Sequence, residues 1–163
     1  MSAVRAPVAV VTDEEWDAWR AFARIRLQLD RALAERLEAN AGISSADYVV
    51  LLVLFEAEDR RLRAVRIAGL IAWEKSRLSH HLTRMEQRGL VRREDCDDDL
   101  RGKWVVLTND GRRAVLKAMR DHNRALREYF FDVVTDEEQA VLSRLSDRVL
   151  GAIDPEVCHD DDA

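Results

Sequence analysis

The chain has 163 residues, 47% of them hydrophobic, so it can bury one core, and we expect one domain or two closely packed subdomains. No apolar run approaches the roughly 18 to 20 residues that span a bilayer, and the first residues do not resemble a signal peptide. We therefore expect a cytoplasmic protein. Its two cysteines lie far apart without a C-x-x-C pair, which argues against a disulfide framework and a thiolate zinc site.

The net charge of −5 hides a segregation of charge along the chain. Residues 60–113 carry 14 Arg and Lys against 8 Asp and Glu, whereas the remaining residues carry 12 against 23. A basic middle between acidic ends is typical of a protein in which one part contacts phosphates. The middle segment is therefore the candidate for nucleic-acid contact.

Capping signals and apolar spacing predict helices in the first third of the chain. The sequence TDEE is a capping-box pattern, and it begins a helix over residues 12–40. Gly42 is a stop signal, and Ser44 or Ser45 is the expected cap of a strongly apolar helix through Leu54. So apolar a helix belongs in the core.

The rest of the chain predicts further helices and one hairpin. A short helix over 64–71 and a polar helix over 75–88 are expected to meet at a tight turn. The β-rich runs LVRRE and GKWVVLT follow and predict a two-stranded hairpin. Thr108 then caps a long helix with apolar residues as far as Val133, and a second TDEE at 135–138 begins the last helix.

The segment IAGLIAWEKSRLSHHLTRMEQRGLVRRE, followed by DDLRGKWVVLTNDGR, resembles the MarR (multiple antibiotic resistance regulator) family of winged helix-turn-helix transcription factors. The resemblance covers roughly residues 12–153. Its most specific parts are MEQRGLVRR, VVLTNDGR and the D-x-R-G of Asp99, Arg101 and Gly102. It implies a mainly α (α+β) fold, a winged helix-turn-helix with long N- and C-terminal dimerisation helices, and an obligate homodimer.

This resemblance divides the chain into five expected segments. They are a flexible N-terminus (1–11), an N-terminal dimerisation helix (12–43), a winged helix-turn-helix DNA-binding lobe (44–108), C-terminal dimerisation helices (109–155) and a disordered acidic tail (156–163). The expected function is a sequence-specific transcriptional regulator, a dimeric repressor released from an inverted-repeat operator on double-stranded DNA by a small amphipathic or aromatic effector. The alternatives are a winged-helix protein-interaction module and a constitutive DNA-binding regulator without a ligand.

The polar helix over 75–88 is the expected reader of the DNA. It has short hydroxyl side chains near its start and cations along the rest, and arginine can bind guanine in a bidentate fashion. An ordinary solvated helix face is the alternative. The resemblance implies that His80 stands where many relatives carry arginine, so its charge depends on pH near neutrality. The expected DNA contacts are Ser76, Arg77, Ser79, His80, Thr83, Arg84 and Arg88 on this helix, and Arg93, Asp99, Arg101 and Lys103 on the hairpin.

Acidic residues crowd the hairpin loop, although DNA is a polyanion. The resemblance implies that Arg101 enters the minor groove and that Asp99 braces it by a salt bridge. The other carboxylates are expected on the solvent side or at the tip, where they weaken binding to all sequences alike and so increase the share of specific base contacts. They are Glu94, Asp95, Asp97 and Asp98.

The sequence gives little support for a metal site, a redox-active cysteine or a catalytic site. Cys96 with the aspartates at 97–99 could imitate a divalent metal site, but consecutive carboxylates lack the spacing of an EF-hand. The same carboxylates raise the pKa of a neighbouring thiol, so an ordinary cysteine is expected. For Cys158 and His159 an acidic tail is favoured over a zinc site. No catalytic motif occurs, so we expect a protein that is not an enzyme and has no cofactor or metal.

Aromatic residues supply a candidate effector pocket. In the family, a cleft between the dimerisation helices and the DNA-binding lobe commonly binds small amphipathic molecules. At helical spacing, however, aromatics are more often core or interface residues, and for His122 a hydrogen-bonded interface histidine is the ordinary alternative. The residues that could line such a cleft are Trp16, Trp19, Phe22, Tyr48 and His122.

Overall fold

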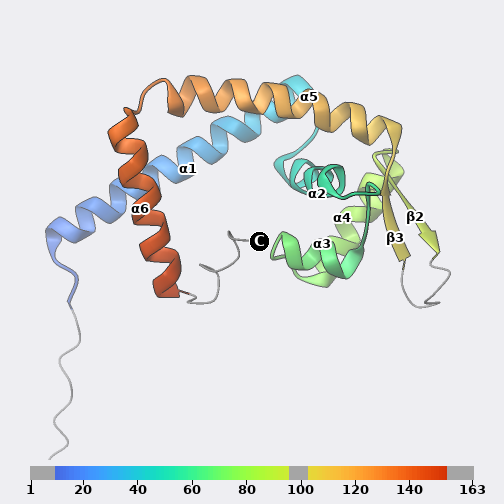
Figure 1. The fold of residues 1–163 in the computed structure, drawn as a ribbon, viewed down its shortest axis with the longest axis horizontal. Coiled ribbons are helices and arrows are strands. Elements are labelled where there is room, and N and C mark those ends of the chain that lie inside the picture. The colour runs from blue at the N-terminus through green and yellow to red at the C-terminus, as the bar shows by residue number, and fades with distance from the viewer. Residues whose placement is uncertain (1–9, 96–102, 154–163) are drawn as a thin grey trace, which may run out of the picture.

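The computed structural model describes residues 10–95 and 103–153 of the chain. The long first helix crosses the last helix with its N-terminal half (Figure 1). A smaller lobe of three helices and a hairpin lies beside its C-terminal end (Figure 1). The elements in order are α1 (Asp13–Ala41), α2 (Ser45–Glu56), β1 (Arg61–Arg63), α3 (Ala64–Leu70), α4 (Lys75–Gln87), β2 (Val91–Asp95), β3 (Lys103–Leu107), α5 (Asn109–Leu126), η1 (Arg127–Phe131) and α6 (Asp136–Ile153).

The predicted helix starts are confirmed by their caps. Thr12 and Glu15 form a complete capping box at the start of α1. Ser44, rather than Ser45, caps α2, and its partner in the box is Asp47. Thr108 accepts a hydrogen bond from a backbone N–H of the first turn of α5. These caps satisfy backbone donors that the helices cannot satisfy themselves.

The sheet has one strand more than the sequence predicted. The strand order is β1-β3-β2, and both pairs are antiparallel. The expected hairpin is present, with Val91 opposite Leu107 and Asp95 opposite Lys103. The additional strand β1 pairs Leu62 with Val105 and so joins the sheet to the beginning of α3.

One hydrophobic core holds the lobe to the C-terminal end of α1. Its fully buried side chains include Leu37 of α1, Leu51 of α2 and Met85 of α4, together with Val105 of β3 and Val115 of α5. Since these residues come from five elements, α4 is fixed against a framework that includes both long helices α1 and α5. The N-terminal half of α1 and all of α6 contribute no buried residue.

A close backbone approach fixes the position of the hairpin relative to α5. Gly111, in the first turn of α5, lies so near the beginning of β2 that a Cβ atom there would stand 2.0 Å from the carbonyl oxygen of Leu90. The Thr108 hydroxyl also donates to the carbonyl oxygen of Gly89 at 2.6 Å. Only glycine fits at this position of the sequence LTNDGR, because any side chain would collide with the backbone at Leu90 and push the hairpin away.

The end of α5 differs from the prediction. The regular helix stops at Leu126 and continues as the π-helical turn η1, so the α-helix does not run on to Val133. A capping interaction between Thr135 and Glu138 then begins α6 as predicted. Within the described ranges no single helix is long and apolar enough to cross a membrane. Only α1 and α2 taken together meet that criterion of length and composition, and they are bent by 75° at their junction.

Candidate nucleic-acid interface

The exposed side of α4 is polar and cationic. The helix buries Leu78, His81, Leu82 and Met85 against the lobe. Its one internal carboxylate, Glu86, is bonded to the backbone and side chain of Arg93. The remaining predicted contacts on this helix are all exposed, and they are Ser76, Arg77, Ser79, His80, Thr83, Arg84 and Arg88.

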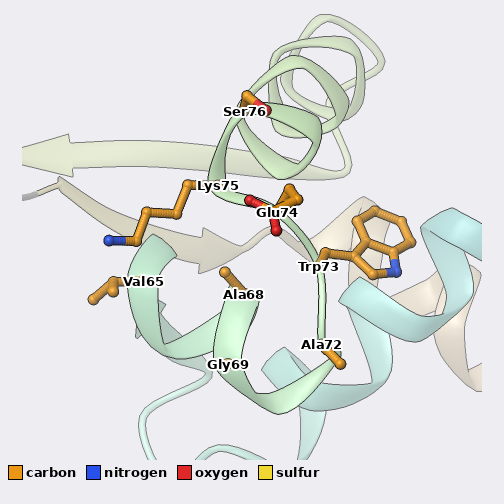
Figure 2. Close-up of a pocket in the computed structure, with 8 residues that line it drawn as sticks. All are labelled: Val65, Ala68, Gly69, Ala72, Trp73, Glu74, Lys75 and Ser76. Carbon is orange, nitrogen blue, oxygen red and sulfur yellow. The ribbon is translucent and has the colours of Figure 1, made fainter.

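The turn between α3 and α4 forms an open hollow of about 690 Å³. Figure 2 shows Lys75 and Val65 on one side of this hollow, Glu74 near its centre and the Trp73 indole pointing to the opposite side. Ala72 adopts a left-handed conformation with φ 51°, an unusual one for a residue with a side chain. This conformation closes the tight turn that the sequence predicted between the two helices.

Trp73 anchors the turn and also supports a cation. Its ring packs edge-on against His81 with the ring centroids 5.5 Å apart. The Arg77 guanidinium lies 4.1 Å from the centroid of the same indole. Stacking on an aromatic face holds an arginine without consuming its hydrogen-bond donors. Arg77 is therefore displayed at the start of α4 with its N–H groups available.

Arg88 is directed toward the lobe. One guanidinium nitrogen donates to Oδ2 of Asp47 at 2.6 Å, and the other donates to the carbonyl oxygen of Gly42 at 3.0 Å. Asp47 is only 1% exposed and also caps α2 through Ser44. Burial raises the pKa of this carboxyl, but hydrogen bonds from Arg88 and Ser44 outweigh burial and hold it below its ordinary value. This pair was not predicted, although the S-x-x-D capping pattern of Ser44 and Asp47 is visible in the sequence.

His81 completes the same buried cluster. It is 6% exposed, its Nε2 atom lies 3.1 Å from Oδ1 of Asp47, and its Nδ1 atom lies 3.1 Å from a guanidinium nitrogen of Arg84. Burial lowers the pKa of His81 below its ordinary value, and the charges of Arg84 and Arg88 act in the same direction. Asp47 opposes these effects. His80 was predicted as a site residue, whereas its buried neighbour His81 was not.

Arg93 connects the hairpin to α4. Its guanidinium donates to the carbonyl oxygen of Ser79 and to the Thr83 hydroxyl, each at 3.1 Å, and it pairs with Glu86 at 3.3 Å. Arg93 therefore supports the predicted recognition helix from β2. Lys103 at the other side of the hairpin is exposed and lies 3.4 Å from Asp95. Asp99 and Arg101 lie outside the described residues, as do Cys96, Asp97, Asp98, Cys158 and His159.

This arrangement, in which a tight turn joins α3 to the polar helix α4 and the hairpin of β2 and β3 follows, is shared with known proteins. The model of the MarR family matches residues 43–103. The chain is 32% identical to Sco3205, a MarR family transcriptional regulator from Streptomyces coelicolor whose crystal structure was solved in complex with DNA, with 95% of this chain and 97% of that chain covered and a TM-score of 0.85. It is 35% identical to AbsC, another MarR family regulator of that organism, with 92% and 98% covered and a TM-score of 0.81. The chain belongs to the MarR family.

As a MarR-family protein it is a transcriptional regulator of the winged helix-turn-helix type, and the predicted fold class is confirmed. The transcriptional regulator HosA of Escherichia coli O111:H- is 27% identical over 133 residues, which are 82% of this chain and 96% of that protein. These relatives are regulators by name, and none of the three is an enzyme by name. Among the described residues, no group of three or more His, Cys, Asp or Glu side chains is placed to hold a metal ion.

The predicted effector residues of this MarR-family chain fall into two separate places. Tyr48 and His122 stack with their ring centroids 5.0 Å apart where α2 meets α5. Burial lowers the pKa of His122 and, together with the charge of Glu56, raises the pKa of Tyr48. Trp19 and Phe22 instead line an apolar groove against α6. Since Leu37 of α1 already belongs to the lobe core, Trp19 lies roughly 27 Å away along the helix axis.

A largely apolar groove lies between α1 and α6 of this MarR-family chain. It has a volume of about 530 Å³, and Trp19 stands beside Leu145 and Val149 of α6. Trp16, also predicted for the effector pocket, is exposed on the same helix and does not line the groove. Large hydrophobic residues remain exposed along both helices. They include Trp16, Trp19, Phe22, Ile25, Val141, Leu145, Val149 and Ile153.

Proposed function

We propose that this MarR-family regulator binds double-stranded DNA with α4 in the major groove and represses transcription there. The observation that carries the proposal is the exposed face of α4, where hydroxyl and cationic side chains stand together and the one carboxylate within the helix is bonded to Arg93. Short hydroxyls allow close approach to base edges, and arginines bind phosphate or guanine. The positive charge of residues 60–113 supplies attraction to the DNA backbone.

The proposed contacts have different roles. Ser76, Arg77, Ser79, His80 and Thr83 are proposed to face bases or phosphates, and Lys75 lies at the hollow beside the α3–α4 turn, where a phosphate could be received. Arg88, Arg93 and Lys103 are proposed to contribute positive charge at the edges of the same surface, and Arg84 is proposed to face phosphate or base edges. By resemblance, Arg101 is proposed to enter the minor groove, braced by Asp99.

We also propose that the protein acts as a homodimer. Both α1 and α6 expose apolar side chains around the groove at Trp19, and a self-complementary interface would remove them from water. A two-fold dimer presents two recognition helices, so the operator is an inverted repeat with half-sites about 10 base pairs apart. Sedimentation equilibrium in the absence of DNA should give the mass of two chains.

The effector is proposed to be a small amphipathic or aromatic molecule that lowers the affinity for the operator. The Tyr48–His122 pair, where α2 meets α5, supports this, because it lies apart from the groove at Trp19 that is proposed as the dimer interface. The molecule must bind two conformations of the dimer unequally, since equal binding shifts nothing. A constitutive regulator remains the alternative if no phenolic or carboxylated aromatic compound both stabilises the protein and releases DNA. The protein is further proposed to be cytoplasmic and not an enzyme.

The decisive experiment is selection of DNA from a random pool, followed by footprinting at one fixed salt concentration. The expected result is an inverted repeat with both half-sites protected. A protein-interaction module on the winged-helix fold would instead select no sequence. That alternative calls for exposed aromatic or aliphatic anchors on the recognition helix, and the exposed face of α4 displays none.

A further inference from the structure

His81 touches charged groups of two different elements through its two ring nitrogens. Its Nδ1 atom lies 3.1 Å from a guanidinium nitrogen of Arg84, and its Nε2 atom lies 3.1 Å from Oδ1 of Asp47. Arginine has only donors, so Nδ1 must accept and cannot carry a proton. The proton of the neutral ring therefore sits on Nε2, where it faces the Asp47 carboxylate.

The surroundings of the ring reinforce this protonation state. Asp47 is held by Ser44 and by Arg88, so its carboxylate stays ionised and fixed in place. The His81 ring packs against the Trp73 indole in a T-shaped arrangement. Glu38 of α1 lines the same cleft as Asp47, His81, Arg84 and Arg88, so the charges around the ring come from α1, α2 and α4.

We infer that His81 is a positioning residue for DNA recognition, which holds the exposed Arg84 of α4 through Nδ1, while the Asp47 carboxylate 3.1 Å from Nε2 favours the proton on that nitrogen. The inference rests on the proposed function of α4. Arg84 uses one donor on His81 and keeps the others for phosphate or base edges. An arginine that is already held loses less rotamer freedom when it binds DNA, so the affinity for the specific sequence is higher.

Protonation of His81 would reverse this arrangement. A charged imidazole carries a proton on both nitrogens, so Nδ1 would face the Arg84 guanidinium with a donor and a like charge. Arg84 would then be released. The added positive charge would still attract the backbone of any DNA, so the affinity for random DNA would not fall when Arg84 is released. Acid pH should therefore lower the ratio of operator affinity to random-DNA affinity.

The first test compares this ratio in three proteins over a pH series from about 7.5 down to about 4.5, because burial holds the His81 pKa below that of an exposed histidine. In the natural protein we expect the ratio to fall about 3- to 10-fold, the range set by the cost of immobilising one side chain. His81→Asn keeps an acceptor near the Nδ1 position and cannot ionise, so its ratio should stay constant. His81→Leu has no acceptor and should show the low ratio throughout the series.

Two results of this test would overturn the inference. One is a His81→Asn protein that retains the natural pH dependence, and the other is loss of that dependence in His80→Asn, which would assign it to the exposed neighbour. Thermal unfolding of each variant by circular dichroism identifies a protein that has failed to fold. If the natural protein selects no operator at any pH, the proposed function fails.

A second test needs no DNA and decides the contact itself. Long-range proton–nitrogen NMR of the histidine side chains in the full chain should show His81 with an unprotonated Nδ1 atom. In Arg84→Met, the His81 pKa should rise, because a neighbouring positive charge has been removed. A ring protonated on Nδ1 at neutral pH, or a His81 titration indifferent to Arg84, would overturn the inference even if the DNA results agreed with it.

Discussion

Arg88 of α4 donates a 2.6 Å hydrogen bond to Asp47 of α2, a residue 41 positions away in the sequence. The carboxylate is almost fully buried, whereas the arginine side chain is 45% exposed. This pair, with the bond from Arg88 to the Gly42 carbonyl oxygen, ties the C-terminal end of α4 to the junction of α1 and α2.

Arg88→Met should therefore destabilise the fold. It leaves a buried carboxylate without its charged donor, at a cost of about 1 to 3 kcal/mol in the free energy of unfolding. Arg92→Met is the matched control, since Arg92 pairs with Glu94 at the surface and should change stability by less than about 0.5 kcal/mol. Urea denaturation measures both. Equal losses in the two variants would show that the Asp47 pair contributes nothing particular.

Stability should also depend on pH through two histidines. Burial lowers the folded-state pKa values of His81 and His122 below the value of 6.5 that an exposed histidine has. The unfolded chain thus binds more protons as the pH falls below about 6.5, so the free energy of unfolding is highest above this pH and declines beneath it. The Asp47 pKa is lowered from 3.8, so its stabilising contribution is lost only below that value.

Denaturation over a pH series tests this assignment. The double variant His81→Asn with His122→Asn should show a flatter curve between about pH 6.5 and pH 4.5. His80→Asn should leave the decline in place. A decline that persists in the double variant would have to come from other groups.

Gly111→Ala should displace the hairpin. The new methyl group would lie 2.0 Å from the Leu90 carbonyl oxygen and 2.9 Å from Cδ1 of Leu107. The first is a backbone atom and the second belongs to a core side chain, so neither can move away easily. We expect a loss of about 1 to 3 kcal/mol in the free energy of unfolding, as for other overpacked sites. Gly69→Ala in α3 is the matched control because nothing lies within 4 Å of its added Cβ atom, and it should stabilise by about 0.5 to 1 kcal/mol. A neutral Gly111→Ala would contradict the close approach.

Leu145→Glu should weaken the proposed dimer. Leu145 is partly exposed in the groove between α1 and α6, and a carboxylate buried there in a dimer interface would lack a partner. Sedimentation equilibrium should show a shift from dimer to monomer, with operator affinity falling in parallel. Lys117→Glu is the control. It changes the net charge more than Leu145→Glu does, but at an exposed position of α5 outside the groove, so the dimer should persist. A dimer unaffected by Leu145→Glu would place the interface elsewhere.

The hairpin loop gives a prediction from the sequence alone. Arg101→Ala should reduce operator binding by about 1 to 3 kcal/mol, and Asp99→Ala should reduce it by less without unfolding the protein. Replacing Asp97 and Asp98 together by Asn should raise affinity for random DNA and lower the ratio of specific to non-specific binding, because repulsion from phosphates is removed. Binding assays at one salt concentration measure all three. Loss of operator binding in the double Asn variant would mean that these carboxylates hold a metal or brace the hairpin.

The sequence predicted those features that depend on neighbours along the chain. The capping residues Thr12, Ser44 and Thr108 gave the helix starts correctly, because a cap bonds to a backbone group only two or three residues away. The hairpin strands were also correct. Strand β1 was missed, since the three residues Arg61–Arg63 are too short to show an alternating pattern and join the sheet only through β3.

The candidate site was predicted in outline but not in its internal contacts. The exposure of Ser76, Arg77 and Ser79 follows from helical periodicity. The bond from Arg88 to Asp47 and the burial of His81 depend on how α2 packs against α4, and no local spacing encodes that. The effector residues were grouped by their aromatic character. They lie at opposite ends of α1 because one continuous helix separates them.

That continuity of α1 gives it the mechanics of a lever. Its 29 residues form one continuous helix, with Leu37 buried in the core of the lobe and Trp19 in the groove beside α6. A rod of this length extends about 43 Å, so a tilt of only about 3 degrees at one end displaces the other by roughly 2 Å. In the proposed dimer, a movement smaller than a side chain at the α6 groove would change the separation of the two copies of α4, and a spacing of one duplex turn leaves little room for such a change.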